Sequence, residues 1–458
     1  MPVLQAPRAW LPTGWAGDVR IDIDDGGWIT AVEPETDAPG AQKLVGATVP
    51  GMPNLHGHAF QRAMAGLTER AAGPGEDFWS WRGTMHRFAA VLTPEQVAAI
   101  AAQLYVEMLK AGYTAVAEFH YLHHGPGGAR YEDPAAMSHA VIGAARQMGL
   151  AITHLPVLYQ RGGFDGGDPE GAVARFASAP DELLGLIQSL KATYGEDPDT
   201  RIGLALHSLR TVTPAGITAA VDGLRSVDAD APIHIHAAEQ VREVEECQAH
   251  LGARPVAWLL DHAPVDARWC VVHATHLDDG EVGRLAQSGA VAGLCPTTEA
   301  NLGDGLFALP AYRAAGGVWG IGSDSHISVD PIEELRLLEY GQRLVHRRRA
   351  VAAAETEPST GTALYTGALA GGAAALGRHT GAIAPGYRAD LVVLDPAAPP
   401  LADQPDHHLF DALVFSGGGR RVRDVMVSGT WVVRDGRHKR EALVFNAYRD
   451  AVADLIAA

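Results

Sequence analysis

The sequence predicts an α/β protein, a (β/α)8 TIM-like barrel with a small β-sandwich domain built from both ends of the chain. Between residues 51 and 377, short apolar runs alternate with longer amphipathic stretches, which is the pattern of a parallel sheet covered by helices. Eight such runs occur there, and eight strands close a barrel. Both chain ends show instead short alternating segments separated by Gly-containing turns, which indicate β-hairpins.

Most of the predicted barrel strands end on a polar or aromatic residue. Their ends fall at or near His56, Tyr121, Tyr159, His207, His236, His273, Cys295 and Asp324. Because active sites of this fold lie at the C-terminal ends of the strands, four of these histidines and the aspartate are expected around one mouth. Residues 92–112 are an example of an intervening helix, with Thr93 as N-cap, Pro94 at the first helical position and Gly112 at the end.

The chain ends predict a second, smaller domain. Residues 18–33 form a hairpin pattern, and residues 389–395 and 422–437 repeat that pattern near the C-terminus. We therefore expect residues 1–50 and 378–458 to form a small β-sandwich domain with a C-terminal helix, and residues 51–377 to form the catalytic barrel. The last helix places one apolar face against the barrel or a partner subunit, with Val444, Tyr448, Val452 and Leu455 on that face.

Charge and cysteine content exclude several classes of function. The chain of 458 residues has 36 Lys and Arg against 54 Asp and Glu, a formal charge of −18, which disfavours nucleic acid and anionic membranes. Its three cysteines are an odd number and form no C-x-x-C pair, which argues against a disulfide framework and a cysteine zinc site. No signal-like N-terminus and no membrane-spanning apolar run is visible. We expect a soluble cytoplasmic protein without nucleic-acid or membrane partners.

The residues at the strand ends indicate a metal site. His56 and His58 follow the first barrel strand, and alternate residues of an extended segment point the same way. An H-x-H pair alone is weak evidence, but His236, His273 and Asp324 also lie at strand ends. Imidazoles and a carboxylate suit zinc, iron or manganese. On this reasoning His273 is either a ligand or a base.

Two further residues bear on the chemistry of this site. Glu239 lies three residues after His236, so its carboxylate can overhang the metal and carry protons. Alternatively it is an acid at a helix N-terminus, stabilised by the helix dipole. The fourth strand ends at His207 and offers no lysine for a bridging carbamate between two metals, so we expect one metal ion.

Several motifs together resemble the amidohydrolase superfamily. They are P-G-M-x-N-x-H-x-H at 50–58, histidines after the fifth and sixth strands, Ser-Asp after the eighth, and G-x-I-x-P-G-x-x-A-D-L-V-V-L-D at 381–395. Four segments, at 54–67, 78–87, 295–305 and 322–344, are similar to the N-formimino-L-glutamate deiminases of histidine degradation.

This resemblance implies a role for each matching residue. One Zn2+ would be bound by His56, His58, His236 and Asp324, and the catalytic residues would be Glu239, His273 and Asp324. His273 would act as general base on the bound water, and Glu239 would move its proton to the departing nitrogen. Substrate recognition would fall to Gln61, Arg82, Tyr121, His207 and Arg210. The resemblance also implies a homodimer.

The expected reaction is hydrolysis of N-formimino-L-glutamate to N-formyl-L-glutamate and ammonia. The substrate carries two carboxylates, which guanidinium groups bind through paired hydrogen bonds, so Arg82 and Arg210 suit it. Arg82 lies between a Trp-Ser-Trp segment, which we expect to form a lid, and Gly83-Thr84. The residues alone leave open release of formamide instead of ammonia; the resemblance selects deimination.

Other functions are open on the same barrel. A deaminase of a purine, pyrimidine or triazine ring is the nearest alternative, since Trp79, Trp81 and Tyr121 could stack on a ring, while two arginines argue against it. A cyclic-amide hydrolase resembling imidazolonepropionase is a weaker one. A barrel without catalysis predicts a broken set of ligands, whereas this set is complete. The nucleic-acid zinc deaminases are excluded because their H-x-E and P-C-x-x-C motifs are missing.

Overall fold

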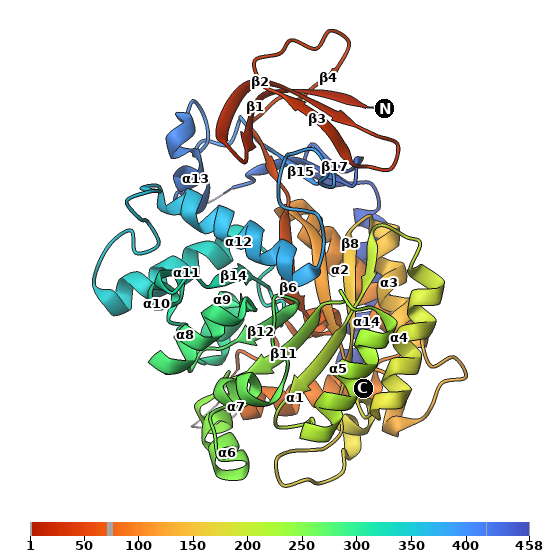
Figure 1. Cartoon of the computed structure of the whole chain (residues 1–458). Helices are drawn as coiled ribbons and strands as arrows, with labels where there is room; N and C mark the ends of the chain where they lie inside the picture. Colours follow the sequence, from red (N-terminus) through yellow and green to blue (C-terminus); the bar gives the residue numbers. More distant parts are fainter. Residues whose placement is uncertain (1, 71–76, 418, 458) are drawn as a thin grey trace.

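Two β-sheets, one of them surrounded by helices, make up the computed structural model, which describes residues 2–70, 77–417 and 419–457 (Figure 1). In the first sheet all neighbouring strands are parallel, in the order β14-β13-β12-β11-β10-β8-β7-β6. A parallel bridge between Gly57 and Asp324 joins its two edges, and the backbone N–H groups of Ser323 and Asp324 donate to His56 O at 3.2 and 3.1 Å. The predicted barrel is therefore confirmed, with a nearly closed ring of eight parallel strands.

The barrel strands coincide with the eight predicted runs. They are β6 (Met52–Gly57), β7 (Tyr113–His120), β8 (Ala151–Leu158), β10 (Leu204–Ser208), β11 (Ile233–Ala237), β12 (Trp269–His273), β13 (Val291–Leu294) and β14 (Val318–Ile321), with β9 (Thr200–Ile202) paired to β8. Almost every residue of these strands is buried, as expected for strands packed on both faces.

Helices connect the strands and cover the outside of the barrel (Figure 1). They are α1 (Phe78–Val91), α2 (Pro94–Ala111), α3 (Ala136–Met148), α4 (Pro180–Tyr194), α5 (Pro214–Val227), α6 (Val241–Leu251), α7 (Pro255–His262), α8 (Asp279–Ser288), α9 (Pro296–Leu302), α10 (Leu309–Ala314), α11 (Pro331–His346) and α12 (Thr360–Leu376), with short 3-10 turns η1 (Ala59–Met64), η2 (Pro126–Gly128) and η3 (Gly171–Arg175). The predicted ends of α2 are confirmed. Thr93 accepts from Gln96 N, and Gly112 ends the helix in the left-handed region at φ 104°.

The second sheet draws its strands from both chain ends, as predicted. It comprises β1 (Val3–Leu11), β2 (Gly14–Ile23), β3 (Ile29–Glu33), β4 (Gln42–Lys43), β5 (Thr48–Pro50), β15 (Leu391–Leu394), β16 (Val422–Val427), β17 (Thr430–Arg434) and β18 (Arg437–His438). β5 joins the two halves, since it pairs with β1 on one side and β15 on the other. Side chains from both halves, including Ile21 and Met426, form a second apolar core. The exact division of the chain into two domains stays a prediction.

The last two helices, α13 (Asp406–Phe415) and α14 (Glu441–Ala457), follow the C-terminal strands or lie between them. α14 packs on α2, and Lys110 donates to Glu441 Oε2 at 2.7 Å. The predicted apolar face of α14 contacts the core, with Val444 and Leu455 buried. Among the described residues no helix has the length and apolar character needed to span a membrane.

Candidate metal centre

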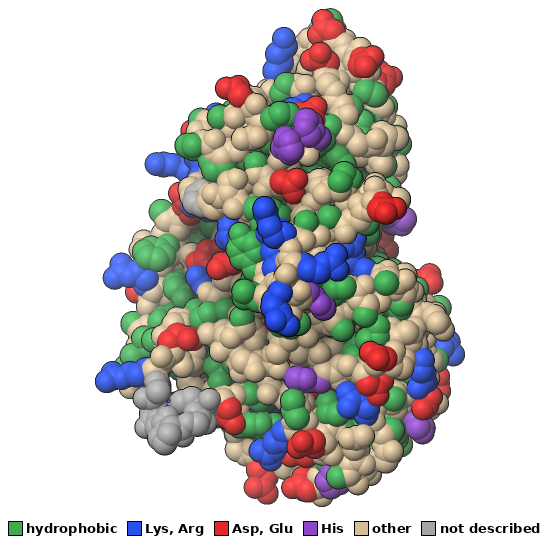
Figure 2. All heavy atoms as spheres, turned by 90° about the vertical axis from the view of Figure 1, so that its left-hand side faces the viewer, with side chains coloured by type: hydrophobic (Ala, Val, Ile, Leu, Met, Phe, Trp, Pro, Cys, Tyr) green, Lys and Arg blue, Asp and Glu red, His purple; other side chains and the backbone are tan. Residues whose placement is uncertain are grey.

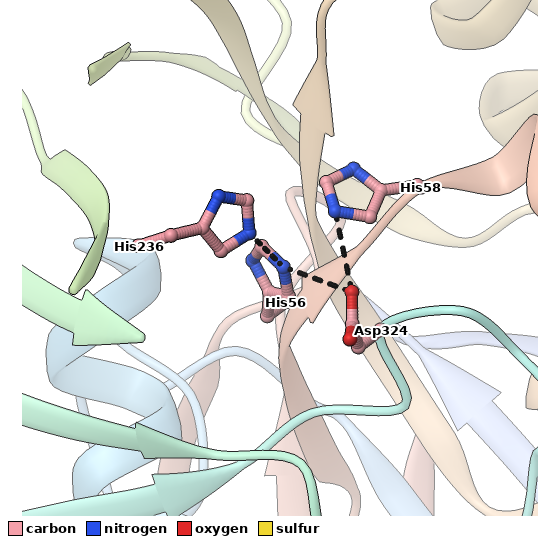
Figure 3. A group of neighbouring side chains, drawn as sticks. All are labelled: His56, His58, His236 and Asp324. Carbon is pink, nitrogen blue, oxygen red and sulfur yellow. Dashed lines mark hydrogen bonds and ion pairs between the residues drawn. The ribbon is translucent and has the colours of Figure 1, made fainter. Parts of the chain in front are cut away.

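Four side chains converge at the C-terminal ends of three barrel strands (Figure 3). His56 and His58 come from the end of β6, His236 from β11, and Asp324 from the loop after β14. Asp324 Oδ1 lies 3.2 Å from the Nε2 atoms of both His56 and His58, and the Nε2 atoms of His56 and His236 are 3.0 Å apart. In a tetrahedral zinc site, neighbouring ligand atoms lie roughly 3.3 Å apart. The spacing therefore fits one metal ion held by these four residues.

The imidazoles are held with Nε2 toward the centre of this group. His58 Nδ1 lies 2.8 Å from Phe119 O, and His236 Nδ1 lies 3.0 Å from His207 O. A backbone carbonyl accepts only from a protonated nitrogen, so Nε2 of each ring keeps its lone pair for a metal. These contacts are typical of the second shell of a metal site.

Burial and the neighbouring charges determine the protonation of these four side chains, which together carry one negative charge. Burial lowers the pKa of His56 to about 3 and holds that of His236 well below its ordinary value, so these imidazoles are neutral. Burial alone would raise the pKa of Asp324, but its contacts with His56 and His58 hold that pKa well below its usual range. A carboxylate with neutral imidazoles suits a divalent cation.

Strained backbone places two of the residues around this centre. His273 has φ 67° and Asp324 has φ 44°, both in the left-handed region that non-glycine residues seldom adopt. Such strain persists where the surrounding structure compensates for it, and it clusters at functional sites.

His273 and Glu239, the two predicted proton carriers, face each other beside the metal ligands. His273 Nε2 lies 3.8 Å from Glu239 Oε1 and 3.9 Å from Asp324 Oδ2. Burial raises the pKa of Glu239 to about 7, a range in which a carboxyl group can both accept and release a proton. Burial lowers the pKa of His273, but Glu239, Glu299 and Asp324 outweigh it and raise that pKa to about 10. A divalent ion nearby opposes this rise.

The five predicted substrate-binding residues line one cavity of about 50 Å³ against the metal centre. They are Gln61, Arg82, Tyr121, His207 and Arg210. Gln61 donates to Tyr121 Oη at 2.7 Å. Arg82 lies in the first half of α1 and donates to Tyr159 Oη at 3.1 Å. The Trp-Ser-Trp segment and Gly83-Thr84 belong to the same helix, and Phe78 and Trp81 from it cover the cavity.

Arg210 is a buried cation with free hydrogen-bond donors. Its side chain is 4% exposed, and its Nε and Nη1 atoms have no partner among the described residues. Neither Arg210 nor Arg82 forms an ion pair with a carboxylate of the residues that the structure describes. Unpaired buried charge is costly, so the cavity is built to receive an anion.

Sequence reasoning missed two acids beside this site. Glu299 Oε1 lies 3.2 Å from His273 Nδ1 and accepts from Cys295 N at 2.8 Å. Asp304 accepts from Gln240 Nε2, and burial raises its pKa to about 9. Both lie in the segment 295–305 that follows a barrel strand, which is the signal that could have indicated them.

Cys295 lies within ligand distance of His273 and Asp324. Burial holds the pKa of its thiol well above the ordinary value.

Residues 47–432 match the model of the amidohydrolase family, and the chain belongs to this metal-dependent family. Residues 1–45 match the N-terminal domain of the formimidoylglutamate deiminase HutF. The formimidoylglutamate deiminase of Pseudomonas aeruginosa is 51% identical over 456 residues, which cover 100% of both chains.

Two solved structures are similar over the whole chain. The crystal structure of an amidohydrolase from Brucella melitensis has a TM-score of 0.94 and 45% identity, with 100% of each chain covered. That of an adenosine deaminase from Xanthomonas campestris with bound zinc has a TM-score of 0.81 and 25% identity, and covers 100% of this chain and 98% of its own. Both the predicted superfamily and the narrower resemblance are therefore confirmed.

Proposed function

We propose that this protein hydrolyses N-formimino-L-glutamate to N-formyl-L-glutamate and ammonia, a step of histidine catabolism. The observation that carries the proposal is that the guanidinium groups of Arg82 and Arg210 line this cavity and form no ion pair with a carboxylate among the described residues. A substrate with two carboxylates supplies the missing acceptors. The relative from Pseudomonas aeruginosa, which bears the name of this activity, supports the same choice.

We propose the following role for each side chain in this reaction. His56, His58, His236 and Asp324 would hold a divalent ion, which would supply a bound water molecule with its pKa lowered toward roughly 7. His273 Nε2 takes the proton that the attacking water gives up, and the oxygen of that water bonds to the formimino carbon. Addition of the oxygen makes this carbon tetrahedral, with a hydroxyl group and both nitrogens bound to it; when the substrate enters as the protonated amidine, its terminal nitrogen is then an NH2 group. Glu239 delivers a proton to that nitrogen, the C–N bond breaks and ammonia leaves. The hydroxyl group returns a proton to Glu239 as the C=O bond of the formyl group forms, and His273 releases its proton to solvent.

Zn2+ is the metal we propose, with one ion per chain. A donor set of three imidazoles and one carboxylate, whose ligand atoms lie within 4.8 Å of one another, supports zinc. The test is metal analysis of protein purified without added metal, followed by reconstitution of the metal-free protein with Zn2+, Fe2+ or Mn2+. Higher activity with iron or manganese at equal occupancy would contradict zinc.

We also propose a homodimer and a cytoplasmic location. Exposed apolar side chains at the end of α11 support the dimer, since Leu344 and Val345 are 80% and 60% exposed beside the basic run of Arg347, Arg348 and Arg349. Figure 2 shows hydrophobic and basic side chains gathered on this side of the molecule. Light scattering on the wild type and on Leu344→Asp tests the assembly. A monomeric wild type would contradict it.

The reaction is tested by ammonia release from N-formimino-L-glutamate, with N-formylglutamate and formamide measured in the same tube. Ammonia with stoichiometric N-formylglutamate is expected. Formamide and glutamate would show that the other nitrogen leaves.

A ring deaminase is the second candidate, because Phe78, Trp81 and Tyr121 line the cavity and the adenosine deaminase described above shares the fold. The half-buried Arg82 and the buried Arg210 disfavour it. Guanine, cytosine and adenosine assayed in parallel separate the two, since turnover of a ring without turnover of the dicarboxylate would select the second.

A further inference from the structure

Glu299 lies behind His273, on the side away from the metal ligands. It belongs to the first turn of α9 and is 4% exposed. Its Oε1 atom accepts from the backbone N–H of Cys295, at 2.8 Å, and lies 3.2 Å from His273 Nδ1. The same oxygen therefore links the start of α9 to the ring at the end of β12.

This contact determines which nitrogen of His273 carries a proton. Glu299 Oε1 accepts a hydrogen bond from Cys295 N, and the same acceptor oxygen faces His273 Nδ1, so His273 Nδ1 is the donor. In the neutral ring, Nε2 then holds the lone pair. Nε2 is also the nitrogen that faces the reacting groups, 3.8 Å from Glu239 Oε1 and 3.9 Å from Asp324 Oδ2.

We infer that Glu299 is a positioning residue that holds His273 in the Nδ1-protonated tautomer, with the basic Nε2 directed at the reacting water. The role of His273 as proton acceptor rests on the proposed function, whereas the tautomer rests on the hydrogen bond alone. Without this acceptor the neutral ring is free to carry its proton on Nε2, and a ring protonated there cannot take a proton from water.

The competing explanation is purely structural, because Glu299 also caps α9 through Cys295 N. The chain offers a matched control for it. Glu334 is a fully buried glutamate that accepts from Thr297 N at 2.8 Å and from Thr297 Oγ1 at 2.6 Å, so it also stabilises the first turn of α9. Among the residues that the structure describes, Glu334 forms no hydrogen bond or ion pair with His273.

Three variants separate the two explanations. Glu299→Gln keeps an oxygen, and the Cys295 N–H directs that oxygen to the same place, so the acceptor for His273 persists. Glu299→Met removes the acceptor at similar side-chain length.

We expect Glu299→Met to lower kcat by about 10- to 100-fold, with KM and bound metal within about threefold of wild type. The kcat of Glu299→Gln should stay much closer to the wild-type value than the kcat of Glu299→Met. Glu334→Met should lower Tm, and its kcat should fall less than that of Glu299→Met. An equal loss of kcat in Glu334→Met, or full kcat in Glu299→Met, would overturn the inference.

A second measurement does not depend on the stability of any Glu299 variant or on the identity of the substrate. Long-range 1H–15N spectra of the zinc-loaded, histidine-labelled wild type report the tautomer of each neutral ring, and His273→Asn identifies the resonances of His273. A proton on Nδ1 is expected at a pH where the ring is neutral. The Nε2-protonated tautomer would overturn the inference even if deimination is confirmed, whereas the expected spectrum would stand even if another substrate is found.

Discussion

Replacing Arg210 with methionine tests the claim that a buried guanidinium binds a substrate carboxylate. Methionine keeps an unbranched side chain but removes all five donors. A hydrogen bond to a charged group is worth about 1.5–3 kcal/mol, which corresponds to a factor of about 10 to 150. Because the Nε and Nη1 atoms of Arg210 have no partner among the described residues, the full contact is available to substrate. We therefore expect kcat/KM to fall by about this factor.

Substrate analogues identify the carboxylate that Arg210 binds. N-formimino-4-aminobutyrate lacks the α-carboxylate, and N-formimino-2-aminobutyrate lacks that of the side chain. If Arg210 binds one of these groups, Arg210→Met will lower kcat/KM for the analogue that keeps it and change little for the analogue that lacks it. Arg210→Lys is the control that keeps the charge without the planar fork, and an intermediate loss is expected. Unchanged kcat/KM for the full substrate in Arg210→Met would refute the reasoning.

The same substitution should affect stability in the opposite direction. A buried cation without an acidic partner destabilises the free enzyme, so its removal relieves a desolvation cost. We expect the Tm of Arg210→Met, at equal metal content, to equal or exceed that of wild type. A large fall in Tm would mean that Arg210 is a structural residue and that its effect on activity is indirect.

Four other predictions concern the proposed metal ligand Asp324, removal of the metal, the cysteines and Arg175. Asp324→Asn should abolish ammonia release and lower bound metal, and near-normal values of both would show that the site is misassigned. Removal of metal by a chelator should lower Tm reversibly, because the ligands are assembled only in the folded state; an unchanged Tm would argue against an occupied site. Burial raises the pKa of Cys247 to about 12 and holds Cys270 and Cys295 above the ordinary value, so a thiol reagent at pH 8 should label none of them before denaturation and all of them after. Arg175 donates to three backbone carbonyls from a fully buried position, so Arg175→Met should lower the free energy of unfolding by about 3–6 kcal/mol, as measured by urea denaturation.

The barrel could be predicted because its strands are short apolar runs with abrupt polar ends. His56, His236 and His273 each close such a run, and the structure places all three at the same mouth. A parallel sheet makes this possible, since its strands all end at one edge. The joining of both chain ends in one sheet was also visible as hairpin patterns, but the pairing of β5 with both β1 and β15 depends on contacts far apart in sequence.

The supporting residues of the site could not be predicted from spacing. Glu299 lies at the start of a helix, where an acid is usually explained by the helix dipole. Its contact with His273 spans 26 residues and depends on how α9 packs under β12. The same holds for the tautomers of His58 and His236, which backbone carbonyls of other strands determine.

Among the described residues Arg210 forms no ion pair, and its contact with Trp79 connects the cavity to the helix that covers it. Trp79 of α1 lies under the guanidinium groups of Arg82, Arg210 and Arg242, at 5.7, 5.4 and 4.4 Å from the ring centroid. An aromatic face attracts a cation without occupying its N–H donors, whereas a carboxylate would attract it and occupy them. A protein with a net charge of −18 can therefore hold positive charge in its cavity and still offer those donors to a dicarboxylate substrate.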